Sequence, residues 1–494
     1  MSNYSIYAEA TRILNKVLLQ DPRLHFPESF VKAAEKVKFV GEDDQPFILT
    51  PLKITESSAA LNALVATAAN VVAAERYGIN YQNVEINTDL ATLFLESVLL
   101  PTIGGKHFMQ SSKMLAELAK MDLYQMSKPI RRYATNVYRT KDGRWYHLHG
   151  SMNALPTMEM LGVEDSDVSI EEAFGIYTKK VAEWDSQDIE KVANENFKQA
   201  GVICYTPDEF FASEHGKTMS EEPLWTSTRV PAPKKTWPEA KDTDRYSPLA
   251  GIRVLDLSRV IAAPAVSKIL SVLGADVIRV SCSKLPEYSA TMPDLQTGKR
   301  DVDIDLKTIE GRRTLSDLIK DADVLVDGYR PGALAKLGFD SKSLHLTSDI
   351  ALANSDYQTG LVGAAAAIQA LLARTQEDVT FDIDISLTQY NIWYYRLGSY
   401  SEDQKKALRN RDPQFSPRYY DDMSALVGKT HQSLQKIRPE IFKHPEYFWD
   451  MSGKEYGLDE DFKVLAPAFK FEKSRIGWSV PTGRRGRSKA EWVS

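Results

Sequence analysis

The fold is decided by the stretch GIRVLDLSRVIAAPAVSKILSVLGADVIRV at residues 251–280 and by TGKRDVDIDLKTIEGRRTLSDLIKDADVLVDGYRPG at residues 297–332. Both contain short apolar runs with many β-branched residues, which are typical of buried parallel strands, and one run alternates in polarity as a strand does. The predicted strands are 252–257, 276–280, 302–306 and 324–326.

Helices are predicted between these strands. Apolar residues recur at helical spacing in 265–273, which Gly274 would end, and in 308–319, where Thr308 is the expected N-cap. Strands that alternate with such helices predict a parallel sheet with right-handed crossovers. Ligands bind these sheets beyond the carboxyl ends of the strands. The predicted ends are 258–260, 281–282 and 328–330.

Composition limits the functional class. At 494 residues the chain exceeds what one hydrophobic core usually fills, and 43% hydrophobic with 26% charged residues is ordinary globular composition. A net charge of -6 gives no general attraction to nucleic acid or to an anionic membrane, so neither is a predicted partner. Two cysteines, Cys204 and Cys282, and an N-terminus without a secretory pattern predict an intracellular protein, cytoplasmic or mitochondrial and not secreted.

An ordered series of motifs carries a resemblance to a known family. VLDLSRVIAAP, LGADVIRV, GKRDVDIDLK, EGRRTLSDLIKDADVLVDGYRPGALAKLGF and SDYQTGLVGAAAAIQALLAR follow one another as they do in the class III CoA-transferases of the CaiB/BaiF type. That family includes formyl-CoA transferase, carnitine CoA-transferase and α-methylacyl-CoA racemase. The resemblance implies an α/β fold with a Rossmann-like parallel sheet, coenzyme A as a substrate in the form of acyl-CoA, and a carboxylic acid as the acceptor. The G-x-G-x-x-G fingerprint of nicotinamide-binding sheets is absent, which argues against a dehydrogenase.

The resemblance also implies which residues contact coenzyme A. They follow the first, second and fourth strands and precede the third: Ile261, Ala262, Cys282, Leu295, Gln296, Thr297, Gly298, Lys299, Gly328, Tyr329, Arg330 and Lys336. Lys299 and Arg330 are the expected contacts to phosphate, because the ligand needs basic groups. Where this chain has Cys282 the family commonly has arginine, so the contacts at the adenine end are expected to differ. No metal is predicted, because the histidines have no ligand spacing.

The family nucleophile is not identified in this sequence. In the family an aspartate attacks the donor thioester and passes CoA to the acceptor, and it lies in a long segment that precedes the SDYQTG-like helix. Here residues 340–360 read DSKSLHLTSDIALANSDYQTG, with a strand stub at 350–353. Asp349 and Asp356 remain there, and Asp356 is the expected helix cap. The catalytic residue is therefore unassigned, and an acyl-CoA racemase or a non-catalytic CoA-binding pseudoenzyme or dimer partner remains as an alternative to a transferase.

An internal repeat indicates two related half-units. Residues 56–97 can be laid over 355–399, with Leu61 on Gly360 and Glu85 on Asp384 at one offset of 299, and each copy predicts a small-residue helix followed by a strand. Residues 55–225 resemble a family C-terminal half placed before an N-terminal half, which is a tandem or permuted order, and a homodimer or an intrachain pseudo-dimer is expected.

Four segments are predicted along the chain. They are 1–229, resembling a family C-terminal half with a smaller α+β lobe whose hairpin turns at 141–144; a proline-rich linker at 230–246; a CoA-binding Rossmann-like domain at 247–400; and a C-terminal extension at 401–494. The basic cluster in that extension, Arg484, Arg485, Arg487 and Lys489, is predicted to be a solvated tail, with a CoA phosphate contact as the alternative.

Overall fold

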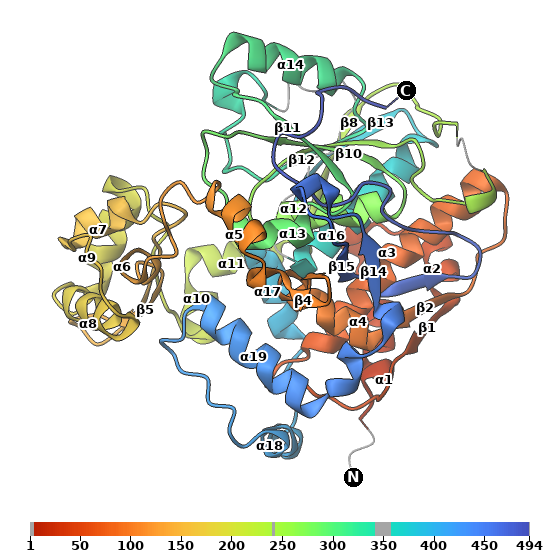
Figure 1. The fold of residues 1–494 in the computed structure, drawn as a ribbon. Coiled ribbons are helices and arrows are strands. Elements are labelled where there is room, and N and C mark those ends of the chain that lie inside the picture. The colour runs from red at the N-terminus through yellow and green to blue at the C-terminus, as the bar shows by residue number, and fades with distance from the viewer. Residues whose placement is uncertain (1–3, 240–242, 341–356, 494) are drawn as a thin grey trace.

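The computed structural model describes residues 4–239, 243–340 and 357–493 (Figure 1). The predicted strand stub at 350–353, together with Asp349 and Asp356, lies outside the described residues. The fold is α/β, with a parallel sheet covered on both faces by helices and a smaller lobe set to one side.

The parallel sheet has four strands in the order β11-β10-β9-β12. They are β9 (Arg253–Leu257), β10 (Asp276–Ser281), β11 (Lys299–Asp303) and β12 (Val324–Asp327). Three of the predicted strands are confirmed to within one or two residues. The third begins and ends three residues before its prediction, because Lys299 and Asp301 are buried in it and their charges hide the strand from a hydrophobicity pattern.

Helices cover the two faces of this sheet. On one face α12 (Ala262–Val272) packs against α16 (Tyr357–Arg374), and α14 (Ile309–Lys320) lies on the other (Figure 1). The Thr308 hydroxyl accepts the backbone N–H of Gly311 at 3.0 Å, which confirms the predicted cap of α14. Gly274 follows α12 with a φ of +108°, as the prediction of a C-terminal glycine requires.

The internal repeat is confirmed as two helix-and-strand units that exchange partner strands. In the first unit α3 (Ile54–Tyr77) leads to β2 (Val84–Asn87), and in the second α16 leads to β13 (Val379–Asp384); the two helices pack against each other. β13 pairs antiparallel with β8 (Thr226–Pro231), which follows the first unit, and β2 pairs antiparallel with β16 (Phe469–Phe471), which follows the second. Each unit is therefore completed by a strand from the other side of the chain.

One hydrophobic core crosses the predicted segment boundaries. This core contains residues from Ile6 to Phe471. The helix α3 is long and apolar enough to cross a membrane, but 94% of its 18-residue apolar stretch is buried inside the protein. The linker region is packed as well: Trp237 donates its indole N–H to Glu75 at 3.0 Å, and Arg76 donates to the Pro238 carbonyl at 2.6 Å. The four predicted segments are thus divisions of the sequence that share a core.

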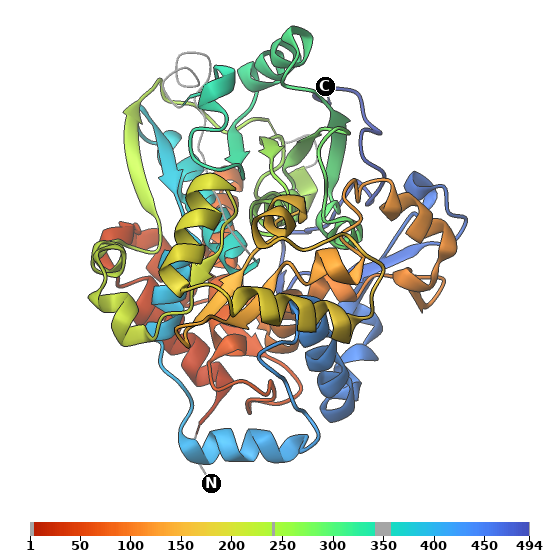
Figure 2. The same ribbon diagram turned by 90° about the vertical axis from the view of Figure 1, so that its left-hand side faces the viewer.

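The smaller α+β lobe has a core of its own, as predicted. Its sheet joins β5 (Asn136–Arg139), β6 (Trp145–Leu148) and β7 (Val202–Ile203), and its helices are α6 (Pro129–Arg132), α7 (Leu155–Leu161), α8 (Ile170–Val181) and α9 (Ser186–Lys191). The hairpin turn between β5 and β6 contains Gly143 at a φ of +80°, which confirms the predicted turn. Figure 2 shows this lobe facing the viewer in front of the main body.

The remaining elements frame the main body. They are α1 (Ile6–Arg12), α2 (Glu28–Ala34), β1 (Val37–Val40), α4 (Thr88–Leu93), β3 (Thr102–Ile103), β4 (Lys106–His107), α5 (Ser112–Ala119), α10 (Pro207–Ala212), α11 (Glu214–Glu221), α13 (Met292–Leu295), α17 (Leu387–Arg396), α18 (Glu402–Arg411), α19 (Met423–Ile437), β14 (Phe448–Met451) and β15 (Phe462–Leu465). After β16 the chain returns to the parallel sheet and ends beside it (Figure 1).

Candidate functional site

The carboxyl ends of β9 and β12 meet closely. The Gly328 N–H donates to the Leu257 carbonyl at 3.0 Å, and a Cβ at Gly328 would lie 2.6 Å from the Cβ of Ser258. The Arg259 guanidinium lies over the Tyr329 ring, 5.5 Å from its centre. Residues 258–260 and 328–330 are therefore brought together, as predicted.

The loop from β9 to α12 is strained. Val260 has a φ of +72°, a conformation that is costly for a β-branched residue and that is often found at functional sites. Ile261 and Ala262 follow it at the start of α12, which has no side-chain cap. The first turn of that helix therefore begins at the sheet edge with its N–H groups uncapped by a side chain, although Ala262 and Ala263 are buried.

The end of β10 joins the same edge. Cys282 follows β10 and is half-buried. Burial raises the pKa of Tyr329 against the opposing charge of Arg259, and Glu287 and, to the smallest extent, Cys282 add to the increase. The loop after Cys282 is tied back to β9, because Arg259 donates to the Pro286 carbonyl at 3.0 Å. Of the predicted contacts, Cys282 therefore lies near Tyr329, and Ile261 and Ala262 directly precede Ala263, whose Cβ would lie 3.0 Å from a Cβ at Gly328.

Two predicted basic residues are exposed beyond β12. The side chains of Arg330 and Lys336 make no hydrogen bond or ion pair with the described residues. Arg330 lies near the smaller lobe, since burial, the neighbouring His147 and the charge of Arg330 together lower the pKa of His149. A loop of that lobe therefore faces the turn that follows β12.

A carboxyl group also lies at this edge. Asp327 ends β12, and its Oδ1 accepts the Tyr329 N–H at 2.8 Å. Burial raises the pKa of Asp327 to about 6, against the opposing effect of that hydrogen bond. Asp327 is therefore ionised at neutral pH but protonated in mild acid.

Lys299 does not present its charge to a ligand. Its ammonium donates to Asp256 Oδ2 at 2.9 Å and to the Pro264 carbonyl at 2.7 Å, and both charged side chains are fully buried. Burial lowers the pKa of Lys299 to about 8, and the Asp256 carboxylate opposes this shift. The prediction that Lys299 contacts a phosphate is wrong for this geometry, because an internal ion pair uses the ammonium.

The rest of the predicted segment before β11 is also displaced from the edge. The parallel register sets Val277 opposite Lys299 and Ser281 opposite Asp303, so Lys299 lies at the beginning of β11, away from Cys282. The other predicted contacts here are Leu295, Gln296, Thr297 and Gly298, and all four are buried. The structure does not bring this segment to the edge; the residues after Asp303 lie there instead.

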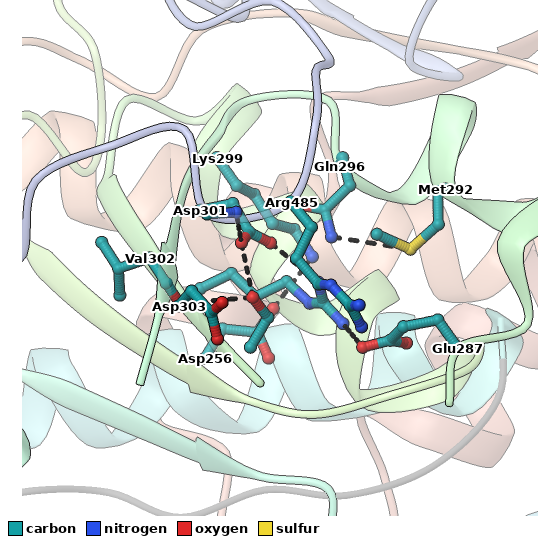
Figure 3. A network of polar contacts seen from close by, with 12 residues as sticks. Asp256, Glu287, Met292, Gln296, Lys299, Asp301, Val302, Asp303 and Arg485 are labelled. Atoms are coloured by element: carbon teal, nitrogen blue, oxygen red, sulfur yellow. Dashed lines mark hydrogen bonds and ion pairs between the residues drawn. The ribbon is translucent and has the colours of Figure 1, made fainter. Parts of the chain in front are cut away.

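A buried charge network supports the edge from below (Figure 3). Arg279 on β10 pairs with Glu287 at 2.5 Å and with Asp301 at 2.7 Å, and all three side chains are almost fully buried. The Gln296 amide oxygen, in the orientation that satisfies both amide atoms, accepts from Arg279 Nη1 at 2.7 Å. Because Glu287 follows Cys282 in the loop, these bonds hold that loop against the sheet.

The basic C-terminal residues contact the protein, and the prediction of a solvated tail is wrong for Arg485 and Arg487, which are half-buried, whereas Arg484 is exposed. Arg484 donates to the Tyr456 carbonyl at 2.9 Å, Arg485 to the Cys282 carbonyl at 3.2 Å, and Arg487 to the Lys299 carbonyl at 2.9 Å. Lys489 is exposed. The packed tail covers the segment before β11.

Sequence reasoning missed one polar side chain at this edge and gave another only as an alternative. Asp327 directly follows a predicted strand, so the rule that parallel strands bind ligands at their carboxyl ends could have included it, as it included Arg259 within residues 258–260. Arg485 was predicted to lie in a solvated tail, with a phosphate contact as the alternative; it is about two hundred residues from Cys282 in the sequence, and no local pattern could have placed it beside that residue.

Comparisons with known proteins identify the family. The family model described as CoA-transferase family III matches residues 249–348. Acetyl-coenzyme A transferase nodX of Hypoxylon pulicicidum is 31% identical over 97% of this chain and 91% of its own length. The chain belongs to CoA-transferase family III.

Further similar proteins match parts of this chain. An acyl-CoA transferase of Gibberella moniliformis is 32% identical over 67% of this chain and 59% of its own length. Among solved structures, the hypothetical protein Rv3272 from Mycobacterium tuberculosis is similar, with 22% identity, a TM-score of 0.27, and coverage of 35% of this chain and 60% of that one. A CAIB/BAIF family protein from Brucella suis has 22% identity and a TM-score of 0.26, covering 35% of this chain and 59% of that one.

Membership of CoA-transferase family III implies coenzyme A as a substrate and CoA transfer as the activity at the level of the family. The described residues include no group of three or more His, Cys, Asp or Glu side chains arranged to hold a metal ion.

Proposed function

We propose that this chain transfers CoA from an acyl-CoA donor to a carboxylic acid, with the acyl-CoA bound at the carboxyl edge of the four-stranded sheet. The observation that carries the proposal is the whole-chain match to an acetyl-coenzyme A transferase together with the closely packed edge at Arg259, Cys282 and Tyr329. In the reaction the donor thioester bond breaks, the CoA sulfur forms a thioester with the acceptor carbonyl carbon, and one acceptor oxygen leaves with the donor acid.

The described edge has chemistry suited to binding the thioester carrier. Arg330 and Lys336 supply exposed positive charge, the uncapped start of α12 supplies N–H donors, and Tyr329 supplies an aromatic surface. The smaller lobe approaches this edge through His149, whose pKa is lowered by burial, by His147 and by the nearby charge of Arg330.

The test is an assay with defined donors and acceptors. The full chain is incubated with acetyl-CoA or a longer acyl-CoA and a panel of carboxylic acids, and new acyl-CoA products are measured by liquid chromatography and mass spectrometry. Product that requires both substrates supports a transferase. Exchange of the α-proton of the donor with deuterated water, without any new thioester, would instead support the racemase alternative.

A second candidate function is binding of CoA without catalysis. The alignment with the Hypoxylon relative spans 546 positions, although it uses only 97% of this chain, so that relative has segments that this chain lacks. This agrees with the short sequence before α16, where the resemblance expects a nucleophile. The second candidate predicts CoA binding by calorimetry, no transfer with any acceptor, and no increase in intact protein mass after exposure to acyl-CoA.

We further infer that one chain supplies both halves of the functional unit as an intrachain pseudo-dimer. The reciprocal pairing of β13 with β8 and of β2 with β16 supports this, because each repeat unit is completed within the same chain. Light scattering after size exclusion should give the mass of one chain, and the mass of two chains would contradict the inference.

A further inference from the structure

The C-terminal tail is fixed against the outer strand of the parallel sheet. The Gly298 N–H donates to the Val480 carbonyl at 2.9 Å, and the Ser488 N–H donates to the Asp301 carbonyl at 2.8 Å. Between these anchors Gly486 has a φ of +69°, and a Cβ there would lie 2.9 Å from the Cβ of Asp303. The tail therefore follows β11 at a distance that only glycine permits at that point.

This path brings Arg485 to the turn that follows β10. Its Nη1 donates to the carbonyls of Cys282 and Leu285 at 3.2 and 2.9 Å, and its Nη2 donates to the Ser283 carbonyl at 3.1 Å. A guanidinium has five N–H donors in one plane, so these contacts use three of them. The Nε–H and one Nη2–H donate to no residue of the described chain, and two such donors suit two oxygens of a phosphate.

Arg485 also differs from its neighbours in charge compensation. Arg484 lies 3.5 Å from a carboxylate oxygen of Glu117, and Arg487 lies 3.5 Å from one of Glu455. Arg485 has no carboxylate partner within 4.0 Å among the residues that the structure describes, and neutral carbonyl groups hold it instead. Its positive charge is therefore uncompensated by a local ion pair, while its side chain is already positioned.

The surrounding edge carries charges of both signs, since Asp303 accepts the Ser283 N–H at 2.8 Å, and it belongs to the site described above. Arg485 contacts the Cys282 carbonyl, and Cys282 is among the groups that lie near enough to Tyr329 to influence its pKa, so the Arg485 guanidinium and the Tyr329 ring lie near the same turn. Lys284 and Lys307 are exposed beside it, and Lys284 is paired with Asp305 at 2.7 Å. Lys307 and Arg485 both lack a carboxylate partner within 4.0 Å among the described residues, and Arg485 is the one that the carbonyl groups of the turn hold in place.

We propose that Arg485, carried by the C-terminal tail, binds the 3′-phosphate at the adenosine end of coenzyme A. The inference rests on the proposed function, because it assigns a residue of the same CoA site. The turn after β10 has the uncharged Cys282 at this position, and the tail brings the positive charge of Arg485 to the same turn. The pantetheine arm then runs from this turn toward Tyr329 and Arg330.

The test compares two ligands that differ only in the 3′-phosphate. Dissociation constants for CoA and 3′-dephospho-CoA are measured by calorimetry for the wild type, Arg485→Ala, Arg485→Lys and the control Arg484→Ala, with thermal unfolding midpoints for each protein. The wild type should prefer CoA, and Arg485→Ala should weaken CoA binding by about 10- to 100-fold, the usual effect of a charged hydrogen-bonded contact. It should leave dephospho-CoA binding unchanged, and Arg484→Ala should change neither.

The result is read as a preference ratio, the dissociation constant of 3′-dephospho-CoA divided by that of CoA for the same protein. This ratio does not depend on small losses of stability. If Arg485→Ala does not fold, Arg485→Lys serves in its place, because it keeps the positive charge but loses the paired N–H donors of the guanidinium. It should prefer CoA over 3′-dephospho-CoA by a smaller factor than the wild type does. A ratio that Arg485→Ala or Arg485→Lys leaves at the wild-type value overturns the inference, as does a wild type that binds both ligands equally. A wild type that binds neither ligand would defeat the proposed function itself.

Discussion

Replacing Lys299 by methionine tests whether this lysine is structural or binds a ligand. The substitution keeps the length of the side chain and removes the ammonium that bonds to Asp256 and to the Pro264 carbonyl. Asp256 then keeps only the hydroxyl groups of Ser258 and Ser267 as partners, in a site that is fully buried. A buried carboxylate that loses its cation is strongly unfavourable.

The expected loss is about 3–5 kcal/mol of unfolding free energy, the usual cost of breaking a buried pair by removing one partner. The double substitution Lys299→Met with Asp256→Asn removes both charges, and it should recover to within about 1–2 kcal/mol of the wild type because no charge is left unpaired. Urea denaturation followed by tryptophan fluorescence measures these differences, and calorimetry with CoA on the folded proteins measures binding.

Three results would refute this reasoning. If Lys299→Met lowers stability by less than about 1 kcal/mol, the pair is not the buried interaction described. If the single variant is as stable as the wild type but has lost CoA binding, the ammonium reaches a phosphate in solution and the original sequence prediction is correct. A double variant no more stable than the single one would show that the charges of Lys299 and Asp256 are not coupled.

Three further predictions test the sheet edge. Arg330→Ala should weaken CoA binding by about tenfold in calorimetry, whereas the exposed Arg313→Ala on α14 should not change it. The folded-state pKa of Asp327 is raised to about 6, so ionisation of this carboxyl group lowers the free energy of unfolding as the pH rises from about 4 to 6. The unfolding free energy of Asp327→Asn should therefore exceed that of the wild type by about 1 kcal/mol at pH 8 and equal it near pH 4. A difference between the two proteins that stays constant across this pH range would contradict the prediction. Gly328→Ala should cost about 1–3 kcal/mol through its 2.6 Å approach to a neighbouring Cβ, while Gly175→Ala, with open space around it, should stabilise by about 0.5–1 kcal/mol.

The parts of the fold that depend on local chemistry could be predicted from the sequence. The apolar strands β9, β10 and β12, the Thr308 cap and the turn at Gly143 each follow from a few adjacent residues. The limits of β11 could not, because its buried charges are tolerated only where partners from β9 and β10 meet them.

The candidate site was predictable only in part for the same reason. The rule for parallel sheets, which needs only the direction of each strand, placed Cys282 and Tyr329 at the edge, and the resemblance placed Ile261 there. Lys299 was placed at the edge although Asp256 holds it inside the protein, and Arg485 was expected in a solvated tail, with a phosphate contact only as the alternative, because its position depends on the path of the tail. Contacts between distant segments leave no periodic signal in a single sequence.

The exchange of strands explains how one site can draw on the whole chain. The parallel sheet precedes the second repeat unit in sequence and packs against it through α12 and α16, whereas the lobe that approaches the sheet through His149 follows the first unit. β8, which follows that lobe, pairs with β13, and this ties the lobe to the second unit, whose α16 packs against α12. The tail is positioned by the opposite exchange, since β16 pairs with β2 before the chain returns to β11. The geometry of the edge therefore depends on both exchanges, so disruption of either strand pair should disturb the site as much as a change within the edge itself.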